Sequence, residues 1–283
     1  MSLDNFIPTI WSARLLVNLQ KALVYGQTGV VNRDYEGEIK NVGDTVKINA
    51  IGAITVGDYT KNGTIAAPEA LTSSQQMLEI NQAKYFNFYV DDIDSVQTKP
   101  KVMDEAMRKA AYSLRDAADQ YIASLYTGVA AGNTIGDDTT PIVPTADNAY
   151  EYLVDMGVLL DEANVPQAGR WVIVPPWFYG LLLKDDRFVK AGTAATDATL
   201  RNGQVGEAAG FTVLKSNNVP NDSGTKYKII AGHPMAWSFA EQILKVEAYR
   251  PHNRFADAVK GLHVYGAKLV RSSAIAVLTA NRS

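Results

Sequence analysis

Residues 97–126 read QTKPKVMDEAMRKAAYSLRDAADQYIASLY and carry the only long helical pattern in the chain. Their apolar side chains recur at steps of three and four, which places them on one stripe of an α-helix. The stripe consists of Met103, Met107, Ala110, Leu114, Ala117, Ala118, Tyr121, Ile122 and Leu125. A helix of about 40 Å, at ~1.5 Å per residue, is longer than average. We therefore expect an amphipathic helix that lies across a sheet.

The opposite face of this helix carries charged residues and is expected to face solvent. Oppositely charged residues four positions apart can meet on a helix surface, and each pair contributes only a few tenths of a kcal/mol, roughly. The pairs are Asp104–Arg108, Glu105–Lys109 and Arg115–Asp119. Pro100 is suited to the first turn and Gly128 to the position after the last one. These signals predict a helix from Gln97 to Tyr126.

The N-terminal part predicts a second amphipathic helix, from Ile7 to Tyr25. Its apolar stripe includes Trp11 and Leu15, and Gly26 ends it. A helix of this length is marginally stable alone in water. We therefore expect it to dock, either on its own chain or on a neighbouring one.

A long hairpin is predicted before the central helix. Residues Thr45–Ile51 alternate between apolar and polar, and a second strand signal runs over Gln76–Val90. Between them, Gly52–Gln75 is longer than ordinary loops and shows short β-like pieces at Ile54–Val56 and Thr64–Ala66. This segment has too few large apolar residues for its own core, and an isolated hairpin is marginal in water. It is either an extended hairpin that needs a partner surface or a floppy insertion.

The second half of the chain predicts a small α/β subdomain followed by several strands. Ala130–Ala146 is a Gly/Thr/Pro/Asp-rich link, and Asp147 is suited to cap the next helix, which ends before Pro166. Trp171–Val174 is a continuous apolar run typical of a buried strand, and a short helix follows over Trp177–Lys184. Later strands are expected at Phe211–Leu214, Tyr227–Ile230, Leu244–Tyr249, Leu262–Val270 and Ala274–Leu278. We expect the long helix to cover the C-terminal strands, so that the chain returns to the first subdomain near Val246.

The composition narrows the class of protein. The chain has 283 residues, of which 47% are hydrophobic, so it can bury a substantial core. Its net charge of −3 and its scattered Lys and Arg residues argue against a dedicated nucleic-acid reader. The absence of cysteine excludes disulfides and thiolate chemistry. No signal peptide or membrane span is predicted, which is typical of a soluble protein made in the cytoplasm.

No catalytic constellation is predicted. The sequence lacks the dinucleotide fingerprint, a phosphate-binding lysine loop and a nucleophile elbow, and His233, His252 and His263 have no metal-ligand spacing. The carboxylates that could serve an enzyme are Asp91, Asp92, Asp94, Asp137, Asp138, Asp161, Glu162, Asp185 and Asp186. Their placement favours helix-terminus stabilisers and solvated turns. We expect no catalytic residue, metal or cofactor, and a soluble α/β enzyme using these carboxylates is the alternative from another class.

Three segments resemble tailed-bacteriophage major capsid proteins. The first is the glycine-punctuated run Leu200–Pro220, with Gly203, Gly206, Gly210-Phe-Thr-Val, Ser216-Asn and Val219-Pro. The second is the C-terminal series Arg250-Pro, Phe255–Gly261, His263-Val-Tyr-Gly266 and Ala274–Leu278. The third is the start, Ile7–Leu16. The order and spacing of these motifs, more than any one of them, carry the resemblance over nearly the whole chain.

The resemblance implies the Hong Kong phage capsid fold, an α+β architecture. Its parts would be an N-terminal arm at 1–40, an extended loop at 41–92, a peripheral domain with a long spine helix at 93–145, an axial domain at 146–245, and C-terminal strands at 246–283 that return to the peripheral domain. Some family members crosslink a loop lysine to a neighbour's asparagine. Lys61 lies in the corresponding kind of segment, but no matching acidic catalytic residue is found.

The resemblance also implies a function in shell assembly. The chain would form hexamers and pentamers of an icosahedral head in the virion, assembled in a bacterial cytoplasm around double-stranded DNA that it contacts non-specifically. A separate scaffolding protein and a portal are expected partners, because no long prodomain precedes the arm. The nearest alternative is an encapsulin-like compartment shell. The residues expected at subunit interfaces are Tyr59, Lys61, Ile65, Trp11 and Leu15.

Overall fold

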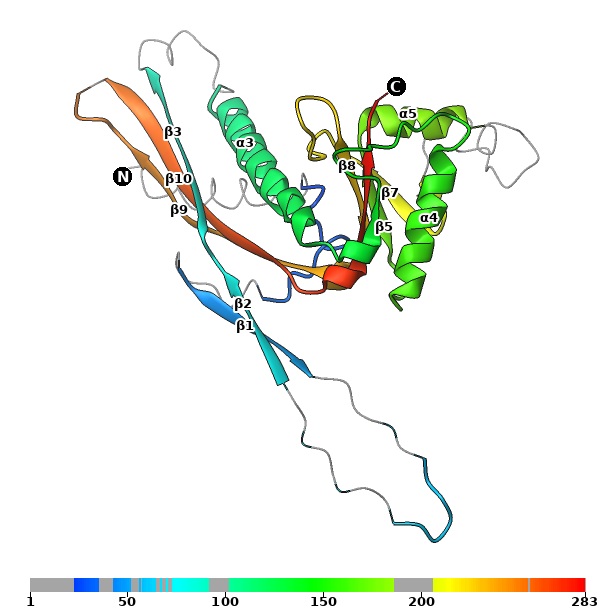
Figure 1. Ribbon diagram of the computed structural model, residues 1–283. Helices are drawn as coiled ribbons and strands as arrows, with labels where there is room; N and C mark the ends of the chain where they lie inside the picture. The colour runs from blue at the N-terminus through cyan, green and yellow to red at the C-terminus, as the bar shows by residue number, and fades with distance from the viewer. Residues whose placement is uncertain are drawn as a thin grey trace.

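The computed structural model describes residues 23–35, 43–51, 56, 58–64, 67, 70, 73–91, 102–185, 206–253 and 255–282. Within these residues the chain forms a two-stranded, a three-stranded and a six-stranded sheet (Figure 1). A long helix lies along the three-stranded sheet, two shorter helices flank the six-stranded sheet, and the loop of the two-stranded hairpin projects away from both. None of the described helices is both long and apolar enough to cross a bilayer.

The long helix, α3, spans Val102–Ser124 and continues into a 3-10 turn at Leu125–Gly128. Its buried residues are Ala111, Leu114, Ala118, Ile122 and Ala123. The first half of this face packs with Met107 against Phe86, Phe88, Val246 and Val259 of the three-stranded sheet. The predicted helix and its stripe are confirmed over the described residues, whereas residues 97–101 lie outside them.

The charged face of α3 differs from the prediction at Asp119. This residue is only 1% exposed, and its carboxylate accepts hydrogen bonds from the backbone of Val24, Tyr25 and Gly26. Asp119 follows the buried Ala118 and precedes Ile122 by three positions, so it borders the apolar stripe, and the N-terminal segment covers this border. Glu105 meets Arg108, at 3.9 Å.

The N-terminal helix was predicted to reach Tyr25, and this end is wrong. Residues 23–25 are not helical, and they pack with buried Leu23 and Tyr25 in the main core. The rest of that predicted helix lies outside the described residues. Further on, Asn32 adds a backbone bridge to Ser238, with its N–H donating to the Trp237 carbonyl at 2.9 Å.

The three-stranded sheet has the order β3–β10–β9 and is antiparallel. Its strands are β3 Gln82–Asp91, β10 Ala256–Leu269 and β9 Trp237–Tyr249. Gly261 stands opposite Phe86, and a Cβ there would lie 2.3 Å from the Phe86 ring. The strand signal at Leu244 therefore marks only the second half of β9, which starts inside the predicted axial domain.

The two-stranded sheet pairs β1, Thr45–Ile51, with β2, Ser73–Glu79. The single strand predicted over Gln76–Val90 is wrong, because it divides into β2 and β3, which belong to different sheets. The chain turns at Ile80, whose N–H donates to the Asp44 carbonyl at 3.0 Å. This hairpin docks on the larger sheet through a small core of Val46, Ile48, Leu78, Ile80, Ala240 and Val264.

The six-stranded sheet has the order β4–β11–β8–β5–β7–β6. Its strands are β4 Thr134–Ile135, β5 Trp171–Val174, β6 Glu207–Ala208, β7 Phe211–Lys215, β8 Tyr227–Gly232 and β11 Ile275–Ala280. Helix α4, Ala149–Glu162, contacts β11, and its Gly157 lies against the Phe211 ring. Helix α5 spans Pro176–Lys184. Asn148 occupies the N-cap position of α4, where Asp147 was predicted.

The last strand corrects the expected path of the chain. β11 was expected under the long helix, but it lies between β4 and β8 in the six-stranded sheet. All six of its residues are buried, as in a strand covered on both faces. The predicted link Ala130–Ala146 contains β4, which pairs with β11 in parallel. Short 3-10 turns connect the remaining parts, at Ala131–Asn133, Pro234–Ala236 and Ser272–Ala274.

Aromatic side chains join the two larger sheets to the N-terminal segment. The Trp237 ring, at the start of β9, lies 5.3 Å from the Trp171 ring of β5 and 6.3 Å from the Tyr25 ring, measured between centroids. All three residues are buried. Residues 23–33 therefore lie where α3 and both sheets meet.

Candidate subunit interface

The loop between β1 and β2 leaves the body of the protein and extends away from it (Figure 1). Every described residue between the two strands is exposed. Its tip is a tight turn in which the Gly63 N–H donates to the Thr60 carbonyl at 2.9 Å, and Asn62 adopts a left-handed φ of 65°. Asparagine tolerates that conformation better than most residues. The turn orders the tip without burying its side chains.

Two of the predicted interface residues lie at this tip. The Tyr59 side chain is 73% exposed, Val56 nearby is 93% exposed, and Lys61 is also exposed. Trp11, Leu15 and Ile65 lie outside the described residues. A contact between Tyr59 or Lys61 and a neighbouring subunit remains a prediction.

A second exposed surface lies on the three-stranded sheet, on the side away from α3. Phe86 and Phe88 point toward α3, so the alternating residues Tyr85 and Tyr89 point outward, at 78% and 50% exposure. The neighbouring strands add Lys260, Glu247 and Tyr249 in register. We call these five residues, with Asn87, the tyrosine face.

The tyrosine face is organised by its own polar contacts. Lys260 pairs with Glu247 at 3.0 Å and lies over the Tyr249 ring, while the Tyr249 hydroxyl donates to Asn87 Oδ1 at 3.1 Å. A shallow depression of about 350 Å³ lies between Tyr85 and this ion pair. Among the described residues β3 pairs only with β10, so its other edge is open. The sequence pattern predicted a strand here but could not show which face the helix covers.

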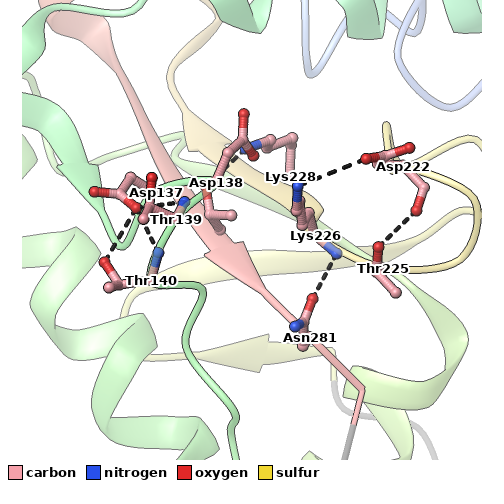
Figure 2. Close-up of polar contacts among 10 residues, drawn as sticks. Asp137, Asp138, Thr139, Thr140, Asp222, Thr225, Lys226, Lys228 and Asn281 are labelled. Carbon is pink, nitrogen blue, oxygen red and sulfur yellow. Dashed lines mark hydrogen bonds and ion pairs between the residues drawn. The ribbon is translucent and has the colours of Figure 1, made fainter.

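A polar cluster occupies one end of the six-stranded sheet, between β8 and the residues after β4 (Figure 2). Asp137 accepts hydrogen bonds from the backbone of Thr139 and Thr140, and these bonds lower the pKa of its carboxyl. Asp138 pairs with Lys228, whose hydrogen bond lowers the pKa of that carboxyl too. Lys228 is buried and also donates to the Thr279 hydroxyl at 3.0 Å. The prediction of a solvated turn thus holds for Asp137, whereas Asp138 is one half of an ion pair.

The same cluster ties the β8 hairpin to the C-terminus. The Lys226 N–H donates to Asn281 Oδ1 at 2.6 Å, and its ammonium lies 3.6 Å from Asp222 (Figure 2). These contacts hold the cluster together, and they bring no nucleophile next to a general base. The arrangement is that of a structural clamp at the end of a sheet.

Asp161 was expected to lie apart on the polar face of its helix, and this is wrong. Its carboxylate pairs with Arg170 at 2.6 Å, and the hydrogen bond lowers the pKa of Asp161. Arg170 is buried and also donates to the carbonyls of Val165 and Pro166. Among the described residues no group of three His, Asp or Glu side chains could hold a metal ion. Asp92, Asp94 and Asp186 lie outside the described residues.

The histidines serve packing where they are buried. His263 is fully buried on β10, and its Nε2 lies 3.1 Å from Glu241 Oε2. The other oxygen of Glu241 pairs with Arg33. His233 instead stabilises a turn, accepting a hydrogen bond at Nδ1 from the Met235 N–H. The chain Arg33–Glu241–His263 therefore joins the N-terminal segment to β9 and β10.

Replacing Glu241 with glutamine is expected to destabilise the fold by about 2 kcal/mol, because buried Arg33 would then face a neutral amide. Glu247→Gln is the matched control: its ion pair with Lys260 is at the surface and is worth about 0–1 kcal/mol. Urea unfolding of both variants measures the difference. Equal stabilities would show that the buried pair contributes nothing.

Comparison with known proteins places these features in context. A family model described as phage capsid protein matches residues 74–278. A structure from Mycobacterium phage Che8 is similar at a TM-score of 0.72 and 32% identity, covering 88% of each chain. The capsid of cyanophage P-SCSP1u gives 0.68 and 16%, covering 87% of this chain and 85% of that one. The holo-SrpI encapsulin complex from Synechococcus elongatus gives 0.57 and 14%, covering 86% and 84%. No curated protein matches this chain.

Proposed function

This chain belongs to the phage capsid protein family, and from that premise we propose that it assembles into hexamers and pentamers that close an icosahedral head around phage double-stranded DNA. The family and the α+β Hong Kong phage capsid fold expected from the sequence are confirmed. The chain is a structural protein of the virion capsid. The observation that carries the assembly proposal is the projecting loop with the exposed Tyr59 and Val56.

The loop supports contacts between copies because of what it exposes. Large apolar and aromatic side chains at the end of a thin extension gain nothing from their own chain, whereas burial against a neighbour removes their surface from water. A loop that reaches from one copy to a different surface of the next makes a heterologous contact. Such contacts generate closed rings when the rotation closes, as hexamers and pentamers require.

The tyrosine face is the receiving surface we propose for the loop of a neighbouring copy. It combines exposed Tyr85 and Tyr89 with one cation and one anion, Lys260 and Glu247. The loop tip carries the complementary set: Tyr59 with Lys61 and Asp58. Aromatic residues with a few mixed charges are typical of protein interfaces. Trp11 and Leu15 remain proposed interface residues of the N-terminal arm.

The parts of the subunit follow from the sheets. We assign the three-stranded sheet with α3 to the peripheral domain, and the six-stranded sheet with α4 and α5 to the axial domain. The assignment differs from the boundaries expected from sequence, because β11 and β4 go to the axial sheet. Residues 41–92 keep the extended hairpin but also include β3, which belongs to the peripheral sheet.

The proposed partners are other copies of the chain, a separate scaffolding protein, a portal and packaged DNA. The net charge of −3 favours weak, non-specific DNA contact for each subunit. A catalytic role is not part of the proposal. The alternative is an encapsulin-like shell, which the likeness to the Synechococcus elongatus complex favours. Particles that co-purify with one cargo protein and without DNA would support the alternative.

A single-cysteine crosslinking experiment tests the loop contact, because the chain has no native cysteine. Tyr59→Cys is labelled with a benzophenone maleimide, assembled, irradiated and analysed by mass spectrometry. We expect crosslinks between subunits to peptides containing residues 82–91 or 256–262, and their loss in dissociated subunits.

The matched control for the crosslinking is Thr139→Cys, which is also exposed but lies at the end of the six-stranded sheet. Its label should not reach the tyrosine face. Assembled particles in which the Tyr59→Cys label finds only its own chain would contradict the loop contact.

A further inference from the structure

One buried carboxylate fixes the point at which the N-terminal segment enters the fold. Asp119 Oδ2 accepts the Val24 N–H at 2.9 Å, and Oδ1 accepts the N–H groups of Tyr25 and Gly26 at 3.2 and 3.4 Å. Asp119 belongs to α3, about 95 positions further along the chain. Leu23 and Tyr25, on either side of the first of these bonds, are buried in the main core. The carboxylate therefore joins the chain that leads to the arm directly to the long helix.

We propose that Asp119 is a proton-dependent latch: its protonated form favours docking of residues 23–26 against α3, and its ionised form favours their release. The reason is the environment. Docking removes the carboxyl group from water almost completely, and desolvation penalises the charged form more than the neutral one. Release returns the carboxylate to water. The inference concerns the single subunit, so it does not depend on the proposed shell.

The electrostatics around Asp119 support this direction. Burial raises the pKa of its carboxyl to about 6, against the opposing effects of the backbone hydrogen bonds and of Arg115 on the same helix. From the docked segment, the Tyr25 phenol faces the carboxyl, and burial raises its pKa well above the ordinary value. Across the helix, burial raises the pKa of Tyr265 of β10 to about 12. Neither phenol titrates in the range where Asp119 does.

The sign of the pH dependence follows from linkage. The docked state holds the Asp119 proton more tightly than the released state, whose carboxyl has an ordinary pKa near 3.8. Docking is therefore strongest below the released pKa and weakens as pH rises toward the docked pKa of about 6. Between about pH 5 and about pH 7.5 the docking constant should fall about tenfold.

A second titratable contact holds the other end of the same segment. Arg33 pairs with Glu241, which also contacts His263. A pH effect on residues 23–33 could therefore arise at His263, and the experiment has to separate the two sites. The variants Asp119→Asn and His263→Gln do so, each removing one titratable group.

Hydrogen exchange of the full-length subunit, followed by mass spectrometry, measures the latch. Protection of the peptide that covers residues 23–31 is compared between about pH 5 and about pH 7.5, after correction for intrinsic exchange, with a peptide from α4 as reference. We expect an about tenfold loss of protection in the wild type. The loss should disappear in Asp119→Asn and persist in His263→Gln.

Asp116→Asn is the matched control, because Asp116 is on the same helix and only accepts a hydrogen bond from Gln120 at the surface. It should retain the wild-type pH profile. A flat wild-type profile, or one that His263→Gln abolishes, would overturn the proposal. If Asp119→Asn fails to fold, the wild type and His263→Gln still decide, since a profile that survives in His263→Gln supports the latch.

Discussion

Deletion of residues 55–73 is expected to yield a folded subunit that forms no closed shells. The deletion removes the exposed loop, including Val56, Tyr59 and Lys61, and leaves the small core in which Val46 and Leu78 dock the hairpin. Residues 52–54 remain as the connection, and hairpins tolerate connections of about two to five residues. The fold should therefore survive, while the proposed contact with the next copy is lost.

Two readouts separate folding from assembly in this deletion. The urea midpoint and the far-ultraviolet circular dichroism should match those of the wild-type subunit, because the deleted residues bury nothing in the described structure. Sedimentation and electron microscopy should show no closed particles under conditions in which the wild type assembles. Normal shells from the deletion variant would contradict the role given to the loop.

Gly266→Ala is expected to destabilise the subunit by at least about 3 kcal/mol. A Cβ at this position of β10 would lie 2.3 Å from the Glu79 carbonyl oxygen and 3.0 Å from the Ile80 Cα. Both atoms belong to the backbone where β2 passes into β3, so no flexible side chain can move aside. The hairpin that carries the loop would have to lift off the three-stranded sheet.

The control for this substitution is Gly180→Ala in α5. A Cβ at Gly180 meets nothing within 4 Å, and alanine in a helix interior is favoured over glycine by about 0.5–1 kcal/mol. Urea unfolding should thus shift in opposite directions for the two variants. A Gly266→Ala subunit with wild-type stability would show that the hairpin does not pack as described.

The elements that sequence reasoning predicts well are those with a long or unambiguous local pattern. The threefold and fourfold spacing in residues 102–124 identified α3, and the burial of Leu114, Ala118 and Ile122 follows it. The apolar run Trp171–Val174 likewise became a fully buried strand. In these cases the period of the side chains alone determines which residues point inward.

The errors arise where a distant partner decides. Alternation continues across Ile80, so the pattern cannot show that β2 and β3 join different sheets. The position of β11 depends on pairing with β4 and β8, which no local signal encodes. Asp119 looks like a surface residue until the N-terminal segment covers it.

The candidate interface divides in the same way. The exposure of Tyr59 and Lys61 could be expected, because their segment lacks the apolar residues of a core. The tyrosine face could not, since alternation gives β3 two faces and only the packing of α3 selects Tyr85 and Tyr89 as the outer pair.

Light scattering after size-exclusion chromatography, with negative-stain electron microscopy of the same fractions, tests the central claim most directly. A capsid shell protein should give closed particles, or rings of five or six subunits that convert to particles. A stable monomer or dimer at high concentration, with no shells at any salt concentration or with any scaffold, would contradict it.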